Sequence, residues 1–101
     1  MIAIRKACAA LKDFELRGCE LFTSCEPCPM CLGAIYWARP ERVYFGAGAA
    51  DAAKAGFDDS LIYSEIPKPH GKRKIPTIQL MRGEALETFR TWERQENKVR
   101  Y

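Results

Sequence analysis

The sequence predicts an α/β fold with a largely parallel sheet. Strand-like segments rich in β-branched and aromatic residues alternate with helix-like segments along the chain, which is the order typical of layered α/β proteins. The chain has 101 residues, enough for one domain. It is 48% hydrophobic and 29% charged, which excludes disordered and collagen-like classes. Its longest apolar run, residues 31–38, is too short to cross a bilayer.

The first half of the chain is expected to alternate helix, strand, helix, strand. Apolar residues recur at helical spacing over the first dozen positions, although no Ser, Thr, Asp or Asn precedes them to cap a helix. Residues 19–24 form the first expected strand and residues 32–39 the next helix, which Pro40 closes. The β-branched and aromatic residues of 42–46 predict a second strand.

The second half is expected to add short helices and one more strand. Residues 51–56 read as one or two helical turns and residues 58–66 as a mixed segment. A basic, proline-containing loop follows at 67–74, and residues 75–81 are expected to form a third strand. From Glu84 onward, apolar residues at helical intervals predict a closing amphipathic helix.

The five cysteines indicate metal or redox chemistry. They are odd in number and crowd the first third of the chain, which makes a poor disulfide framework. The amino terminus lacks the long apolar stretch of a signal peptide, so a cytoplasmic, reducing location is expected. Clustered thiols in that compartment usually bind metal or exchange electrons.

Cys28 and Cys31 are the strongest candidates for metal ligands. Pro29 suits the first position of a helix, which places Cys28 at the cap and Cys31 in the first turn. A helix N-terminus favours thiolates, and this spacing lets two sulfur atoms converge on one ion. Both cysteines share a helical face with Ile35 and Ala38, so the sulfur atoms are expected at the edge of the core. Two sulfurs make half of a zinc site.

Three other interpretations of the cysteines stay open. In the first, the cysteines are inert core residues. In the second they are ligands of an iron–sulfur cluster, and in the third Cys28 and Cys31 are the dithiol of a thioredoxin-like oxidoreductase. Cys25, Cys28 and Cys31 are spaced by threes, but Ile35 stands where a ferredoxin has its fourth cysteine. The oxidoreductase also places Cys-x-x-Cys at a helix start, and residues 75–77 resemble the proline turn of thioredoxins.

Residues 24–40 resemble the second half of the zinc signature of the cytidine/deoxycytidylate deaminase superfamily. They read Ser-Cys-Glu-Pro-Cys-Pro-Met-Cys-Leu-Gly-Ala-Ile-Tyr-Trp-Ala-Arg-Pro. The branch is the one containing tRNA adenosine deaminases and bacterial guanine deaminases, and residues 51–60, the 75–76 segment and Tyr101 are more similar to the latter. The resemblance implies a three-layer α/β/α deaminase domain that is only partial in 1–101, with Zn²⁺ as cofactor. It implies hydrolytic deamination of a small purine, guanine to xanthine plus ammonia, with a tRNA adenosine deaminase as the alternative.

The family's catalytic glutamate and its histidine ligand are not found in this sequence. In the family, one His and two Cys bind zinc. A Glu that is not a zinc ligand acts first as the general base and then as the general acid, and this Glu and the His come from a His-x-Glu motif. By resemblance that motif belongs just before Met1, so we expect an N-terminally truncated domain lacking two strands and a helix. His70, the one histidine, lies in a polar loop and is not expected to substitute. We expect weakened zinc binding by Cys28 and Cys31, and negligible deamination.

Three residues are candidates for substrate binding. Asp58 and Asp59 are suited to capping a helical turn, but the resemblance implies that Asp59 accepts hydrogen bonds from guanine's N–H groups. It also implies that Tyr101 belongs to a tail that folds over an active site, either its own or that of a partner subunit. Trp37 is a candidate pocket residue, although a core or dimer contact is its simpler interpretation.

A homodimer is the expected assembly, because the missing strands leave a sheet edge unpaired and aggregation-prone. Neither a membrane nor a nucleic acid is expected as partner. The net charge of +3 permits an anionic partner without requiring one, and the basic residues 68–74 lack the interleaved aromatics of single-strand binders. A non-catalytic dimerisation partner of a full-length homologue is a further alternative.

Overall fold

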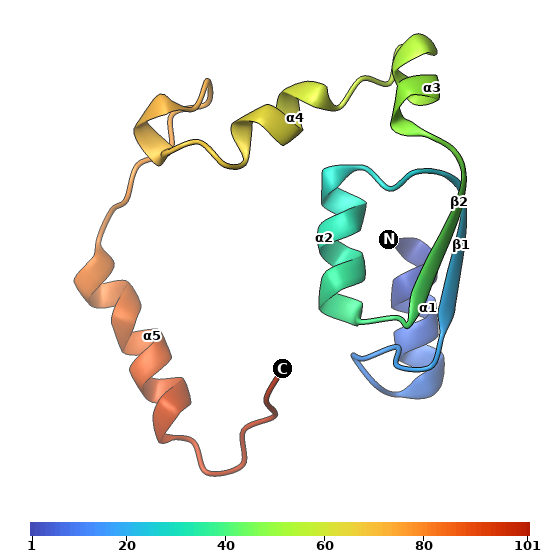
Figure 1. Cartoon of the computed structure of the whole chain (residues 1–101). Coiled ribbons are helices and arrows are strands. Elements are labelled where there is room, and N and C mark those ends of the chain that lie inside the picture. Colours follow the sequence, from blue (N-terminus) through green and yellow to red (C-terminus); the bar gives the residue numbers. More distant parts are fainter. The chain divides into compact units, whose positions relative to one another are not determined.

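A computed structural model describes all residues from 1 to 101 (Figure 1). The elements in chain order are α1 (Ile2–Leu11), β1 (Glu20–Cys25), α2 (Pro29–Ala38), β2 (Arg42–Ala47), α3 (Ala49–Lys54), α4 (Ser60–Glu65), the 3₁₀ turn η1 (His70–Lys72) and α5 (Arg82–Arg94). They fall into two compact units, Met1–Pro67 and Lys68–Tyr101. No helix is both long enough and apolar enough to cross a membrane.

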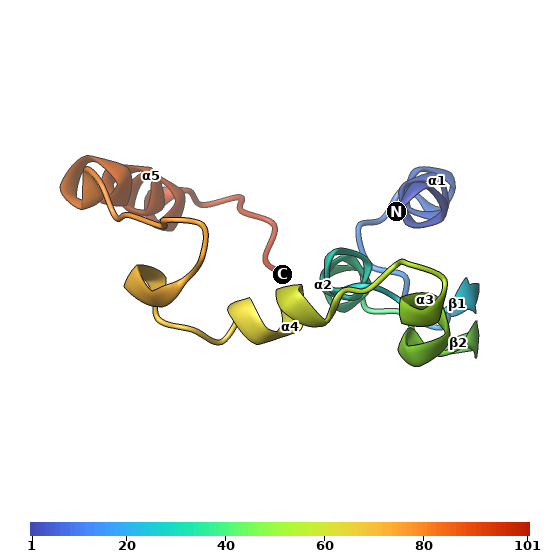
Figure 2. The ribbon, with the colours of Figure 1, turned by 90° about the horizontal axis from the view of Figure 1, so that it is seen from above.

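The first unit is built on a two-stranded parallel sheet. β1 pairs with β2 in parallel, in a register that runs from Glu20 opposite Arg42 to Cys25 opposite Ala47. α2 makes the crossover between the strands, and α1 and α2 lie on the same side of the sheet (Figure 2). The predicted α/β class and parallel sheet are therefore confirmed.

Alternation along β1 decides which side chains face the helices. Leu21, Thr23 and Cys25 are half-buried, whereas the residues between them are exposed. At the end of the sheet the strands approach closely, since a side chain on Gly46 would place its Cβ only 2.9 Å from the Ser24 carbonyl oxygen. Glycine is required there by space and not by backbone conformation.

α2 begins and ends where local rules place its boundaries. Cys28 is the N-cap and Pro29 lies in the first turn, as the position of the proline predicts. The helix therefore begins three residues before the helical segment expected at 32–39. Arg39 ends the helix in a left-handed conformation (φ 54°), its N–H donating to the Ile35 carbonyl, and Pro40 follows. Ile35 and Ala38 are buried with Leu16, and these three form the core.

An ion-pair group attaches the loop before β1 to the end of α2. The Glu15 carboxylate accepts hydrogen bonds from the guanidinium groups of Arg17 and Arg39. These bonds, that of Arg17 foremost, hold the pKa of Glu15 below its ordinary value of 4.5. Next to this group, the N–H of Leu16 donates to the Ala38 carbonyl at 2.7 Å.

The second unit contains η1 and α5 and no strand. The third strand expected at residues 75–81 is wrong: the segment is irregular, and Ile75, Ile78 and Leu80 are exposed. Its β-branched composition favours a strand, but a strand needs a neighbour for its backbone groups, and none lies beside it. The closing helix is confirmed as α5, which begins at Arg82 and ends before Val99.

Candidate metal and substrate site

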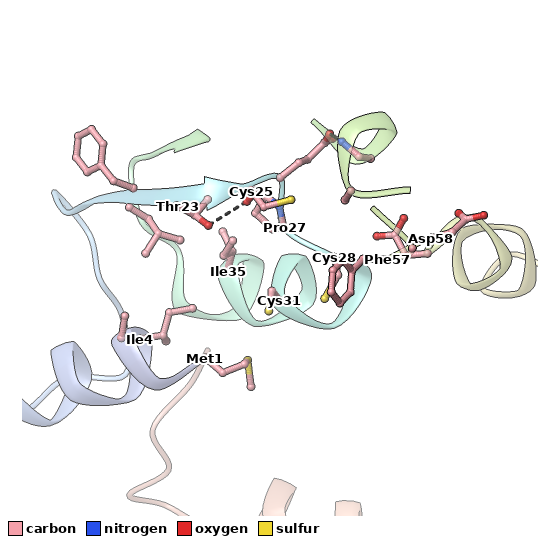
Figure 3. Close-up of a pocket in the computed structure, with 18 residues that line it drawn as sticks. Met1, Ile4, Thr23, Cys25, Pro27, Cys28, Cys31, Ile35, Phe57 and Asp58 are labelled. Carbon is pink, nitrogen blue, oxygen red and sulfur yellow. Dashed lines mark hydrogen bonds between the residues drawn. The ribbon is translucent and has the colours of Figure 1, made fainter. Parts of the chain in front are cut away.

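The first unit contains an open cavity of about 610 Å³ (Figure 3). Its lining comes from α1, β1, the turn between Cys25 and Cys28, α2, α3 and the segment from Gly56 to Asp59. Segments that are distant in sequence thus meet around one space. Cys28, Cys31 and Asp59, three of the five predicted site residues, line it.

Cys28 and Cys31 sit together at the start of α2. Both are half-buried, and both point their sulfur atoms toward the cavity side of the helix (Figure 3). The neighbouring backbone N–H and thiol of Cys31 lower the pKa of Cys28. The pKa of Cys31 is raised, because its thiol donates to Cys28 and because it is partly buried. The helix start therefore makes Cys28 the more acidic of the two thiols.

This donor pair fits part of a zinc site. Thiolates at a helix start are suitable zinc ligands, but a catalytic zinc needs three protein ligands and an open position. The structure gathers no group of three or more His, Cys, Asp or Glu side chains around one point. Cys25 also lines the cavity without joining such a group, and the exposed His70 belongs to the second unit. The residues present thus supply two sulfur donors of an incomplete set.

The two aspartates that line the cavity have different partners. Asp58 accepts the N–H of Ser60 at 2.9 Å, and this bond lowers the pKa of Asp58. Asp59 is the N-cap residue of α4, but its side chain makes no capping hydrogen bond. Asp59 is half-buried and close enough to Cys28 for its charge to raise that thiol's pKa in part. Asp58 therefore does the capping, and the Asp59 carboxylate lies in the cavity lining without a capping hydrogen bond.

Sequence reasoning missed two cavity residues. Phe57 lines the cavity although it is 78% exposed (Figure 3). Glu26 also lines the cavity, and its carboxylate accepts the N–H of Ala49 at 2.8 Å. Burial, with the nearby charges of Asp59 and Glu26, raises the pKa of the Tyr63 hydroxyl. The Gly-Phe-Asp-Asp sequence was the available signal for Phe57, whereas nothing local indicated the contact of Glu26.

The other two predicted residues are not among those that line the cavity. Trp37 is 66% exposed and is not among the residues that line the cavity, so the structure does not bring it to the thiols. Tyr101 belongs to the second unit. The substrate-binding roles of both residues stay predictions.

Comparison with known proteins shows which families this chain resembles. Residues 1–47 match the family model described as the cytidine and deoxycytidylate deaminase zinc-binding region. The chain is 57% identical to guanine deaminase of Bacillus subtilis (strain 168) over 99 residues, which cover 98% of this chain and 64% of that protein. It is 49% identical to the tRNA-specific adenosine deaminase of the same organism over 47 residues, 46% of this chain and 29% of that protein.

A solved structure agrees with this result. The X-ray structure of guanine deaminase from Bacillus subtilis superposes with a TM-score of 0.92 at 56% identity, covering 98% of this chain and 63% of the crystallised one. The chain thus spans just under two thirds of the guanine deaminase that it matches. The sequence match, the structural match and the zinc-region match agree: residues 1–47 match the zinc-binding region of cytidine and deoxycytidylate deaminases, and 98% of the chain is similar to a guanine deaminase.

Proposed function

We propose that these 101 residues form part of one guanine deaminase domain and supply two zinc-binding thiols and a purine-binding wall. The observation that carries the proposal is the cavity itself, which is lined both by the segment with Cys28 and Cys31 (the thiol wall) and by residues 56–59 (the acidic wall). The similarity to guanine deaminase, which extends over 98% of the chain, supports the choice of a purine.

Each wall has a distinct part in this proposal. Cys28 and Cys31 hold the zinc ion, which when bound activates water for hydrolysis at the amine-bearing carbon of the base. Asp59 accepts hydrogen bonds from the ring N–H and amino group of guanine, because a carboxylate offers only acceptors. The ring of Phe57 offers a flat apolar face for the heterocycle. The base is thereby oriented with its polar edge toward Asp59.

The proposal leaves two requirements to groups that these 101 residues do not provide. One is the third zinc ligand, since no third donor is gathered with the two thiols. The other is the carboxylate that transfers protons during hydrolysis. Glu26 is poorly placed for that task, because its carboxylate already accepts the Ala49 N–H. We therefore propose that the chain alone binds zinc weakly and deaminates negligibly.

Incubation of the chain with Zn²⁺ and guanine tests the proposal. Xanthine is followed by its ultraviolet spectrum and ammonia by a coupled assay, beside a longer version extended before Met1 by a segment that contains His-Ala-Glu. We expect substoichiometric or weak zinc and no xanthine from the chain, and both zinc and turnover from the longer version. Xanthine from the chain itself contradicts the assignment of roles, and a disulfide cycling between Cys28 and Cys31 supports the oxidoreductase alternative instead.

Assembly and location complete the proposal. A homodimer is proposed because the sheet has only two strands, and several large apolar side chains, Tyr36 among them, are exposed. A cytoplasmic location is proposed because all five cysteines are free thiols. Sedimentation of the purified chain checks the first proposal, and fractionation of the source cells checks the second.

A further inference from the structure

One side-chain hydrogen bond connects the turn that leads into the thiol wall with α3, the helix that leads to the acidic wall. Glu26 lies in the turn between Cys25 and Cys28, which leads into the thiol-bearing start of α2. Its carboxylate oxygen Oε2 accepts the N–H of Ala49, the first residue of α3, at 2.8 Å. α3 then continues to the segment that carries Asp59. The bond therefore spans 23 positions of sequence and connects the turn before the thiols to the start of α3, the helix that precedes the acidic wall.

The other carboxylate at this end of α3 acts differently. Asp51 accepts the N–H of Gly48 at 3.0 Å and so caps its own helix. Glu26 and Asp51 thus accept hydrogen bonds from adjacent amides, but Glu26 alone of these two reaches across from the thiol turn. Removing the Asp51 carboxylate weakens α3 locally, whereas removing the Glu26 carboxylate releases one wall from the other. The pair provides a matched comparison.

The backbone next to Glu26 supports the same connection. The N–H of Glu26 donates to the Ala47 carbonyl at 2.8 Å, which continues the pairing of β1 and β2 by one step. Backbone pairing fixes where the thiol turn starts, and the carboxylate fixes where α3 leaves the sheet.

We propose that Glu26 is a positioning residue, whose carboxylate holds the purine-binding wall at its working distance from Cys28 and Cys31. The proposal rests on the proposed function for the identity of the ligand. A ligand that contacts both walls depends on the bond, whereas a metal ion held by the two thiols depends on one wall alone. Glu26 therefore affects purine affinity and metal affinity unequally.

Binding measurements on four variants of the full chain test this proposal. Guanine affinity is measured by equilibrium dialysis, and metal affinity by the absorption of Co²⁺ bound to thiolates. We expect Glu26→Ala to weaken guanine binding about tenfold, the scale of one hydrogen bond to a charged acceptor, and Co²⁺ binding by less than about twofold. Glu26→Gln keeps an acceptor oxygen at the same reach, and we expect it to restore guanine binding. Asp51→Asn is expected to leave both affinities near those of the parent chain.

Glu26→Asp keeps the charge but shortens the side chain by one methylene, so it cannot reach Ala49. We expect it to lose guanine affinity as Glu26→Ala does, which provides the result if the alanine variant does not fold. Unchanged guanine binding in a folded Glu26→Ala or Glu26→Asp overturns the proposal. Equal losses of guanine and Co²⁺ also overturn it, since they indicate a general structural role.

Hydrogen exchange separates this proposal from the proposed function. The Ala49 amide is expected to exchange about tenfold faster in Glu26→Ala than in Glu26→Gln or Asp51→Asn, with or without ligand. If the parent chain binds no guanine, the proposed function fails while the exchange result still decides whether Glu26 joins the walls. Equal exchange of Ala49 in all variants overturns the positioning role.

Discussion

Replacing Gly46 by alanine is expected to weaken the sheet that supports the site. The new Cβ would lie 2.9 Å from the Ser24 carbonyl oxygen, and ordinary contact begins at 3.4 Å, so the two strands must separate by about 0.5 Å. Both groups are fixed by strand pairing, and no flexible side chain can yield in their place. Overpacking of this kind costs about 1–3 kcal/mol.

Gly33 provides the matched control for this substitution. It lies inside α2, and a Cβ built there meets nothing within 4 Å. Gly33→Ala is therefore expected to stabilise the chain by about 0.5–1 kcal/mol, because alanine loses less backbone entropy in a helix.

Urea unfolding followed by far-ultraviolet circular dichroism distinguishes the two substitutions. For a slope of about 1–2 kcal/mol per molar urea, Gly46→Ala lowers the midpoint by about 1 M while Gly33→Ala raises it slightly. Midpoints that move together, or a Gly46→Ala chain as stable as the parent, refute the close approach of the strands. A lower slope with an unchanged midpoint points to a change in cooperativity and not to the steric argument.

Three further predictions concern the core, the thiols and acid stability. Ile35 is 7% exposed, so Ile35→Ala is expected to destabilise the chain by about 2–4 kcal/mol, against little change for Tyr36→Ala at 76% exposure, as thermal unfolding will show. Iodoacetamide is expected to label Cys28 at lower pH than Cys31 in the metal-free chain, because the pKa of Cys28 is lowered and that of Cys31 is raised. Labelling in the opposite order, detected by mass spectrometry, contradicts the interaction between Cys28 and Cys31 that causes these shifts. Because the pKa of Glu15 is lowered in the fold, its ionised form stabilises the fold at pH values above the ordinary pKa of 4.5. That stabilisation is lost as the pH falls and the carboxylate is protonated, so the urea midpoint of the parent should drop in acid more steeply than that of Glu15→Gln.

The parts of the fold that were predicted correctly depend on short-range rules. The start of α2 follows from Cys28 and Pro29 alone, since a proline at the first helical position needs no distant partner. Its end follows from the Arg39–Pro40 pair in the same way. The two strands of the sheet are recognisable because each has a residue composition that suits pairing, and each has the other as its neighbour.

The third strand shows why composition alone is insufficient. Residues 75–81 have the β-branched and apolar content of a strand, but strand formation depends on a partner whose presence composition does not report. Trp37 shows the same limit for the site. Its position in α2 was predictable, whereas the orientation that leaves it 66% exposed and away from the cavity depends on tertiary packing.

The two walls of the cavity therefore differ in how the sequence encodes them. The thiol wall is local, because Cys28 and Cys31 lie on one turn of helix whose own backbone lowers the pKa of Cys28. The acidic wall is assembled over distance, because Asp59 reaches the thiols through α3 and through the contact of Glu26 with Ala49. Metal affinity should accordingly tolerate substitutions in α3 that abolish purine binding. A change of substrate in relatives of this chain would then require changes in the residues that place the second wall, with the cysteine pair left as it is.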